Sequence, residues 1–193
     1  MRRQRKSFFS RNSKFQAGMT LVETMIALAI LLVVASGVMV LAVTAVTTTE
    51  TQGHLAARTA EYAQDKMEQL MALKFCDQIT DTTVFPASTT TGNGTGLAGC
   101  NNPGNINPPP TPLAGGSLST TAPTAGYVDY LDASGNLVAA GANWQFIRVW
   151  QISVPAGTTG IKQISVLAQA RYAVGQAGLL PQTTVVALKT FPL

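Results

Sequence analysis

The sequence predicts an α+β protein in which a long N-terminal helix packs on a small antiparallel β-sheet. Between Glu23 and Glu50 the chain has 26 consecutive uncharged residues, and no proline occurs before Pro86, so a helix can continue well beyond this run. From Tyr127 onward, strand-like segments alternate with turn residues. Only 11% of the 193 residues are charged, against roughly 25% in average soluble domains. This composition argues against an ordinary cytosolic enzyme.

The apolar run is long enough to cross a membrane. Of the 22 residues from Met25 to Val46, only three are not strongly apolar. As a helix they would span ~33 Å, which matches a hydrocarbon core of ~30 Å. The apolar part of a cleaved secretory signal is shorter, at ~7–15 residues. The sequence therefore predicts one membrane-spanning helix over residues 19–46.

A basic leader precedes this helix. Six of the thirteen lysines and arginines lie before Gly18 with no acidic residue among them, whereas from Met19 onward seven basic residues face nine acidic ones. The basic character belongs to residues 1–18 alone, so it does not indicate a nucleic-acid partner. The positive-inside rule places this leader in the cytoplasm and the C-terminal domain on the opposite side of the membrane.

The helix is predicted to continue over residues 47–75 as an amphipathic segment. Its apolar residues recur at helical spacing and form one stripe: Leu55, Tyr62, Ala63, Met67, Leu70 and Met71. Residues 76–126 follow as an irregular connection. From Thr82 to Val128 it has no charged residue, seven prolines and eight glycines. Prolines at this density are incompatible with helices and central strands.

Residues 127–193 are predicted to form an antiparallel sheet of three to five strands. Its expected segments are Tyr127–Leu131 and Leu137–Ala140 around a turn at Asp132–Gly135, then Trp144–Val154, Lys162–Val174 and Thr183–Phe191. The apolar face of this sheet should pack on the helical stripe, because neither element can bury its apolar face alone.

Cys76 and Cys100 are the two cysteines of the chain. Both follow the membrane span, on the side where a disulfide can persist. We expect them to form a disulfide, with two free thiols as the alternative. Closing this loop would contribute ~3–4 kcal/mol in the chain-entropy model.

No catalytic constellation emerges from the sequence. His54 is the only histidine and is expected at the surface, and Asp77 and Asp81 lack a third ligand nearby for a metal. The segment Gly94–Gly99 spells G-x-G-x-x-G, but it neither follows a strand nor opens a helix, as a dinucleotide site requires. Asn93–Thr95 is a weak match to a glycosylation acceptor. We expect no enzyme activity, no metal and no cofactor.

Glu23 is the informative residue. A carboxylate near the start of an apolar helix costs up to a few kcal/mol if it lies unpaired in lipid. Such a residue is a functional hypothesis that needs a named partner. The alternative is a shallow glutamate at the level of the lipid headgroups.

The segment Gly18–Glu23, between a basic leader and an apolar span, resembles the processing site of type IV pilins and type II secretion pseudopilins. The resemblance implies a pilin fold, cleavage by a prepilin peptidase between Gly18 and Met19, and N-methylation of Met19. It also implies an assembly role for Glu23, whose carboxylate would neutralise the terminal amine of an adjacent subunit. In a helix bundle of low dielectric constant, such a pair favours one axial register.

Further segments are similar to PilV-type minor pilins. These are Tyr62–Leu70 at the end of the long helix, and the predicted strand pair Trp144–Trp150 and Ile161–Val166. Together with the position of the cysteines, they imply a minor type IV pilin, a structural subunit involved in pilus biogenesis. It would lie in the inner membrane with a periplasmic C-terminal domain, and in the pilus after assembly. Its implied partners are prepilin peptidase, major and minor pilins, an assembly platform and membrane lipid.

Two other functions stay open at this point. One is a minor pseudopilin of a type II secretion system. The other is a membrane-tethered adhesion module that contacts a surface through the charge-free connection; it would keep Gly18 and Met19 joined and would not enter filaments.

Overall fold

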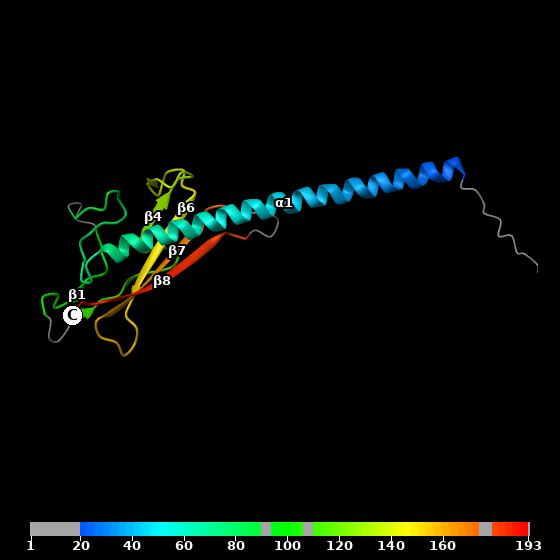
Figure 1. The fold of residues 1–193 in the computed structure, drawn as a ribbon. Coiled ribbons are helices and arrows are strands. Elements are labelled where there is room, and N and C mark those ends of the chain that lie inside the picture. Colours follow the sequence, from blue (N-terminus) through cyan, green and yellow to red (C-terminus); the bar gives the residue numbers. More distant parts are fainter. Residues whose placement is uncertain (1–19, 90–93, 106–109, 174–178, 193) are drawn as a thin grey trace, which may run out of the picture. The chain divides into compact units, whose positions relative to one another are not determined.

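The computed structural model describes residues 20–89, 94–105, 110–173 and 179–192. These residues form one long helix, α1 (Leu21–Ala72), and eight strands (Figure 1). The chain divides into two compact units, Met1–Ala45 and Val46–Leu193. Helix α1 contributes to both of them. The strands are β1 (Cys100–Asn101), β2 (Thr111–Pro112), β3 (Gly115–Gly116), β4 (Val128–Leu131), β5 (Leu137–Val138), β6 (Phe146–Ser153), β7 (Ile161–Ala170) and β8 (Gln182–Thr190).

Helix α1 is 52 residues long, and it ends at Ala72, before the predicted end near residue 75. Its last turn contains no basic residue. A lysine from another element supplies the missing positive charge: Lys189 Nζ of β8 donates a hydrogen bond of 2.6 Å to the carbonyl of Met71. A cation at this place satisfies one of the free carbonyls at a helix C-terminus.

The main sheet of the second unit has the strand order β5-β4-β6-β7-β8, with β3 paired to β6 beside this path. All of its pairings are antiparallel. The sheet has six strands, which exceeds the expected three to five, because the connection over residues 76–126 contributes β3. At β3, a Cβ on Gly116 would strike the carbonyl oxygen of Trp150, so only glycine allows this close pairing.

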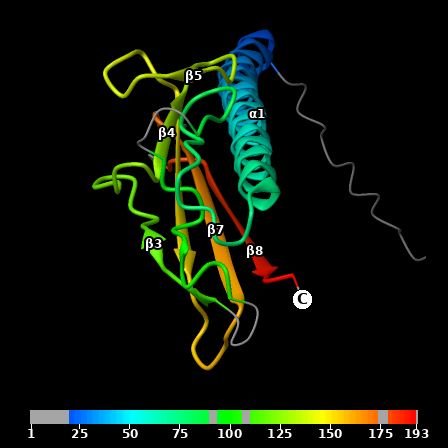
Figure 2. The same ribbon diagram turned by 90° about the vertical axis from the view of Figure 1, so that its left-hand side faces the viewer.

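Residues 46–72 of α1 pack on one face of this sheet (Figure 2). The buried helical residues are Thr59, Tyr62, Ala63, Lys66, Met67 and Leu70. From the sheet, Phe146, Trp150, Ile152, Ile164 and Val166 join the same hydrophobic cluster. This core lies where the sequence placed it, and the α+β fold of a long helix on an antiparallel sheet is confirmed.

Two details of the predicted core were wrong. Met71 is 36% exposed, whereas Lys66 lies on the buried stripe in α1. The strand predicted over Trp144–Val154 begins later, at Phe146 of β6, so Trp144 lies outside it. It packs instead against a second cluster around Val149 and Leu167.

Candidate assembly site

The first turn of α1 is held by Thr20. Its Oγ1 accepts a hydrogen bond of 3.3 Å from the backbone N–H of Glu23, and its carbonyl accepts one of 3.2 Å from the N–H of Thr24. Thr20 is therefore the N-cap of the helix. The spacing Thr-x-x-Glu is that of a capping box, so the sequence itself carries the signal for this role of Thr20.

The carboxylate of Glu23 lies on an exposed, otherwise apolar surface. Its neighbours Val22 and Ile26 are 64% and 56% exposed. Within the described part of the chain, no salt bridge involves Glu23. Its place in the first helical turn is electrostatically favourable, because the helix dipole is positive there. An ion-pair partner for Glu23 would thus have to come from outside the described residues.

The predicted cleavage and methylation residues, Gly18 and Met19, lie outside the described residues, as does the leader over residues 1–18. Thr20 is the first residue of this region that the structure describes.

The apolar part of α1 is not covered by any other described residue of the first unit. Its large apolar side chains are exposed by 55% at Val43 to 75% at Leu21. Among the described residues, α1 is the one helix that is long and apolar enough to cross a membrane. A helix that is apolar all round requires lipid or other helices around it.

Residues 13–39 match the family model of the prokaryotic N-terminal methylation motif. The match supports a type IV pilin or pseudopilin family. It covers the end of the basic leader, the Gly18–Glu23 segment and the first part of the span. No curated protein and no solved structure matches the chain.

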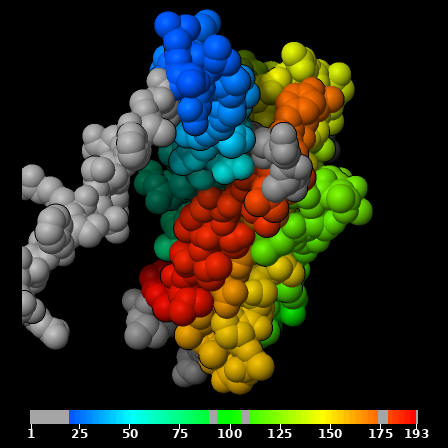
Figure 3. All heavy atoms as spheres, turned by 90° about the vertical axis from the view of Figure 1, so that its right-hand side faces the viewer, coloured from blue at the N-terminus to red at the C-terminus, as the bar shows by residue number. Residues whose placement is uncertain are grey.

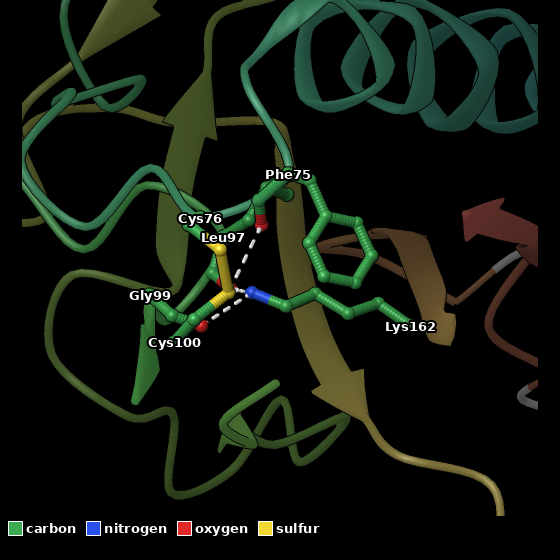
Figure 4. The surroundings of a disulfide bond; sticks show 6 residues. All are labelled: Phe75, Cys76, Leu97, Gly99, Cys100 and Lys162. Carbon is green, nitrogen blue, oxygen red and sulfur yellow. Dashed lines mark hydrogen bonds between the residues drawn. A yellow bond between two sulfur atoms is a disulfide. The ribbon is translucent and has the colours of Figure 1, made fainter. Parts of the chain in front are cut away.

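In the second unit of this pilin-like chain, Cys76 and Cys100 form the predicted disulfide, with their Cα atoms 5.0 Å apart (Figure 4). The ammonium group of Lys162 from β7 lies beside this bond and is fully buried. Its Nζ donates hydrogen bonds to the carbonyls of Leu97 at 2.5 Å and Gly99 at 2.6 Å. The disulfide and Lys162 together fix the first part of the connection to the end of the helix and to the sheet.

The pKa of Lys162 falls to about 8. Burial is the main cause, since it removes the hydration of the ammonium group, and the nearby Asp77 opposes the shift. The aromatic ring of Phe75 lies 5.1 Å from Nζ. Lys162 is thus a buried cation whose hydrogen-bond acceptors are backbone carbonyls, with no carboxylate in direct contact among the described residues.

The glycine-rich segment Gly94–Gly99 packs around Asp77. The N–H groups of Leu97 and Gly99 donate to the Asp77 carbonyl at 2.8 Å and 3.1 Å. A Cβ on Gly94 would strike the carbonyl oxygen of Ile79. These glycines therefore serve close contact between backbone segments, which explains them without a phosphate ligand.

The other polar candidates take part in local structure. The Asp77 carboxylate accepts hydrogen bonds from the N–H and hydroxyl of Thr80, and Asp81 accepts the corresponding pair from Thr83. His54 is exposed on α1. Within the described ranges, no group of three or more metal-ligating side chains is found.

A buried ion cluster, which sequence reasoning missed, joins α1 to the sheet. Asp129 of β4 accepts a hydrogen bond of 2.8 Å from Lys66 Nζ, and bonds of 2.8 Å and 2.9 Å from Nε and Nη2 of Arg148. Arg148 Nη1 also donates to Asp65 at 2.7 Å. Two cations thus meet two carboxylates, and Lys66 additionally donates to the Thr82 carbonyl at 2.6 Å.

The charges of this cluster are desolvated to different degrees. Lys66 is fully buried and Arg148 is 2% exposed, whereas the Asp65 side chain is 56% exposed. Burial lowers the pKa of Lys66 below its ordinary value, although Asp129 opposes this. Burial would also lower the pKa of Arg148, but Asp129 and Asp65 together raise it. Lys66 lies four residues after Tyr62 and four before Leu70. It therefore falls on the predicted apolar stripe, and this position was the sequence signal for its burial.

Proposed function

We propose that this chain is the precursor of a minor type IV pilin, a structural subunit involved in the biogenesis of an envelope pilus. One observation carries the proposal: an exposed apolar helix has a single carboxylate in its first turn, within a matched N-terminal methylation motif. Such a helix serves either as a membrane anchor or as one member of a helix bundle. A pilin uses it for both purposes in succession.

Processing is the first step of this function. A prepilin peptidase at the cytoplasmic face cleaves between Gly18 and Met19, and the new terminal amine of Met19 is methylated. The product keeps Thr20 as the helix N-cap and Glu23 in the first turn. Cleavage thereby places a positive amine close to a carboxylate that has no ion-pair partner within the described residues.

Assembly is the second step. The processed chain stays in the inner membrane, with its C-terminal domain in the periplasm, until an assembly platform moves it into the filament. Glu23 then pairs with the terminal amine of a neighbouring major or minor pilin. The pair is worth most in a dry helix bundle, where a buried charge without a partner is costly.

The disulfide favours a minor over a major pilin. It closes residues 76–100 directly after the helix and leaves the C-terminal strands without a cross-link, whereas many major pilins carry their cysteines in the C-terminal region. Pseudopilins of type II secretion share the N-terminal motif. Deleting the pilus assembly genes or the secretion genes separately would show which machinery takes up the chain.

Expression with an active or an inactive prepilin peptidase tests the proposal. We expect intact-protein mass spectrometry to show loss of residues 1–18 only with the active enzyme. Gly18→Ala should still be processed, whereas Gly18→Leu should not, because the scissile bond requires a small residue. An intact N-terminus in the presence of the active peptidase would refute the proposed function.

A further inference from the structure

One end of the second unit is defined by the place where α1 enters it, at Val46. Thr183, at the start of β8, contacts Thr59 of α1 at 3.0 Å, whereas Lys189, near the end of β8, contacts Met71. Strand β8 therefore runs along α1 in the same direction. The segments that lie next to the start of β8 consequently lie at the end of the unit where α1 enters.

Aromatic and apolar side chains gather at this end. We call them the entry patch, which consists of Trp144, Arg171, Tyr172, Leu179 and Leu180. Tyr172 is 57% exposed, Leu179 is 66% exposed and Leu180 is 41% exposed, and Trp144 is half-buried. Figure 3 shows the yellow segment before β6 and the orange segment after β7 beside each other on the surface.

Arg171 is the charged residue of the entry patch. Its guanidinium group lies 4.6 Å from the ring of Trp144 and 5.4 Å from that of Tyr172, and Nη1 donates a hydrogen bond of 3.1 Å to the Trp144 carbonyl. Within the described ranges, no salt bridge involves Arg171. The sequence has no further charge between Arg171 and Lys189. The patch thus presents a cation among aromatic and apolar groups, with no carboxylate of its own.

The level of the patch along α1 follows from β8. The six residues between its two contacts with the helix span ~20 Å, and the twelve helical residues that they reach span ~18 Å, so both elements advance at the same rate. Leu179 precedes Thr183 by four residues, or ~13 Å. This distance corresponds to about nine helical residues, which brings Leu179 near the level of Glu50.

Glu50 lies just beyond the predicted span. It follows Val46, the last residue of that span, by four residues, which is ~6 Å along a helix. The headgroup layer on each side of a hydrocarbon core is ~5–8 Å thick. A chain anchored through α1 therefore holds the entry patch at the level of the lipid headgroups.

We propose that the entry patch is a membrane contact, which seats the second unit on the phospholipid surface around α1. Tryptophan and tyrosine are enriched at exactly this depth, because their rings are apolar and their polar atoms remain hydrated. Leu179 and Tyr172 enter the headgroup layer, and Arg171 binds a lipid phosphate. The inference rests on the proposed membrane anchoring by α1, and it holds for a pilin, a pseudopilin or a tethered module alike.

Tryptophan fluorescence of the full chain in vesicles tests this contact. The chain has two tryptophans, and Trp150 is fully buried, so Trp144 reports on the patch. The vesicles contain phosphatidylcholine, phosphatidylglycerol and a phospholipid with a nitroxide on its headgroup, which quenches only at short range. We expect the wild-type emission to be quenched, and the quenching to be absent from Trp144→Phe.

A matched pair of substitutions locates the contact. Leu179→Asp should abolish the quenching, because a carboxylate is repelled by the lipid phosphates. Leu188→Asp, at a leucine that is 60% exposed near the other end of β8, should leave it unchanged. Tyr172→Asp is a second variant within the patch and should act like Leu179→Asp. Unchanged emission spectra in vesicles without nitroxide show that each variant is folded.

Flotation of the same vesicles measures anchoring separately. A chain that floats with the vesicles but whose wild-type emission is not quenched would overturn the membrane contact and leave the anchor intact. Equal quenching in Leu179→Asp and Leu188→Asp would overturn it as well. A chain that does not float would overturn the anchoring by α1, and the contact with it.

Discussion

The two parts of the chain differ in whether their charged side chains form ion pairs. In Val46–Leu193, the buried cations Lys66 and Arg148 meet Asp129 within hydrogen-bond distance. In residues 21–45, Glu23 is the only charged residue, and no salt bridge within the described residues involves it. In the globular unit the buried carboxylate of Asp129 is thus paired with two cations, whereas the apolar segment carries a carboxylate whose ion-pair partner is not among the described residues. The difference is the one expected if, as proposed, Glu23 pairs with another subunit while the ion cluster acts within one molecule.

The largest effect on stability is expected at the centre of the ion cluster. Asp129→Asn leaves Lys66 and Arg148 buried without their shared counter-ion, and should destabilise the globular unit by ~3–5 kcal/mol. Asp65→Asn is the matched control: its side chain is 56% exposed, so its loss should cost only ~0–1 kcal/mol. Denaturant unfolding of the full chain in detergent, followed by tryptophan fluorescence, measures both. Equal shifts would show that the buried pairing does not dominate.

The disulfide should rank second. Cys76→Ser should lower the free energy of unfolding by ~2–4 kcal/mol, because it frees the loop of the unfolded chain. Reduction of the wild-type chain is the control and should reproduce the loss, while membrane insertion stays unchanged. Non-reducing peptide mapping of envelope material should recover the Cys76–Cys100 cross-link; two free thiols there would refute it.

Lys162 should have the smallest effect, and one that depends on pH. Its pKa is about 8 in the folded chain, below the ordinary 10.5, because burial disfavours its charge. Below pH 8 both states hold the proton and the cost of burial is complete. Between pH 8 and 10.5 the unfolded chain binds more protons, so stability should rise with pH.

Lys162→Met should remove this rise. Near neutral pH it should also cost ~1–3 kcal/mol, because the carbonyls of Leu97 and Gly99 lose this buried donor. Lys189→Met is the comparison, because burial also lowers the pKa of Lys189, but its ammonium group lies at the helix end. Denaturation midpoints at pH 7 and pH 9.5 decide the point. The same rise in wild type and Lys162→Met would show that Lys162 is not its source.

Much of the fold could be predicted because its signals are local. The uncharged run, the absence of proline before Pro86 and the turn at Asp132–Gly135 fix the long helix and the first hairpin through backbone chemistry. The cysteine pair was also predicted from its position after the span. The ion cluster was not, because Asp129 and Arg148 are separated by 19 residues and lie 63 or more residues beyond Lys66. Only the strand register brings them together.

The same limit explains β3. Gly115 and Gly116 carry no strand signal of their own, and their pairing with β6 depends on the folded sheet. Thr20 was different, because the Thr-x-x-Glu spacing was visible in the sequence. Glu23 thus has two roles in its turn: its backbone N–H donates to Thr20, and its side chain supplies the carboxylate.

The central claim is that Glu23 pairs with another subunit, and filament incorporation tests it most directly. Glu23→Gln keeps the backbone N–H that Thr20 caps and removes only the charge. The membrane fraction and the folding of the globular unit should be unchanged. Loss of a buried pair at ~3–5 kcal/mol corresponds to a factor of at least ~100 in assembly. We therefore expect the variant to accumulate in the inner membrane and to be nearly absent from sheared filaments. Equal incorporation of wild type and Glu23→Gln would contradict the account.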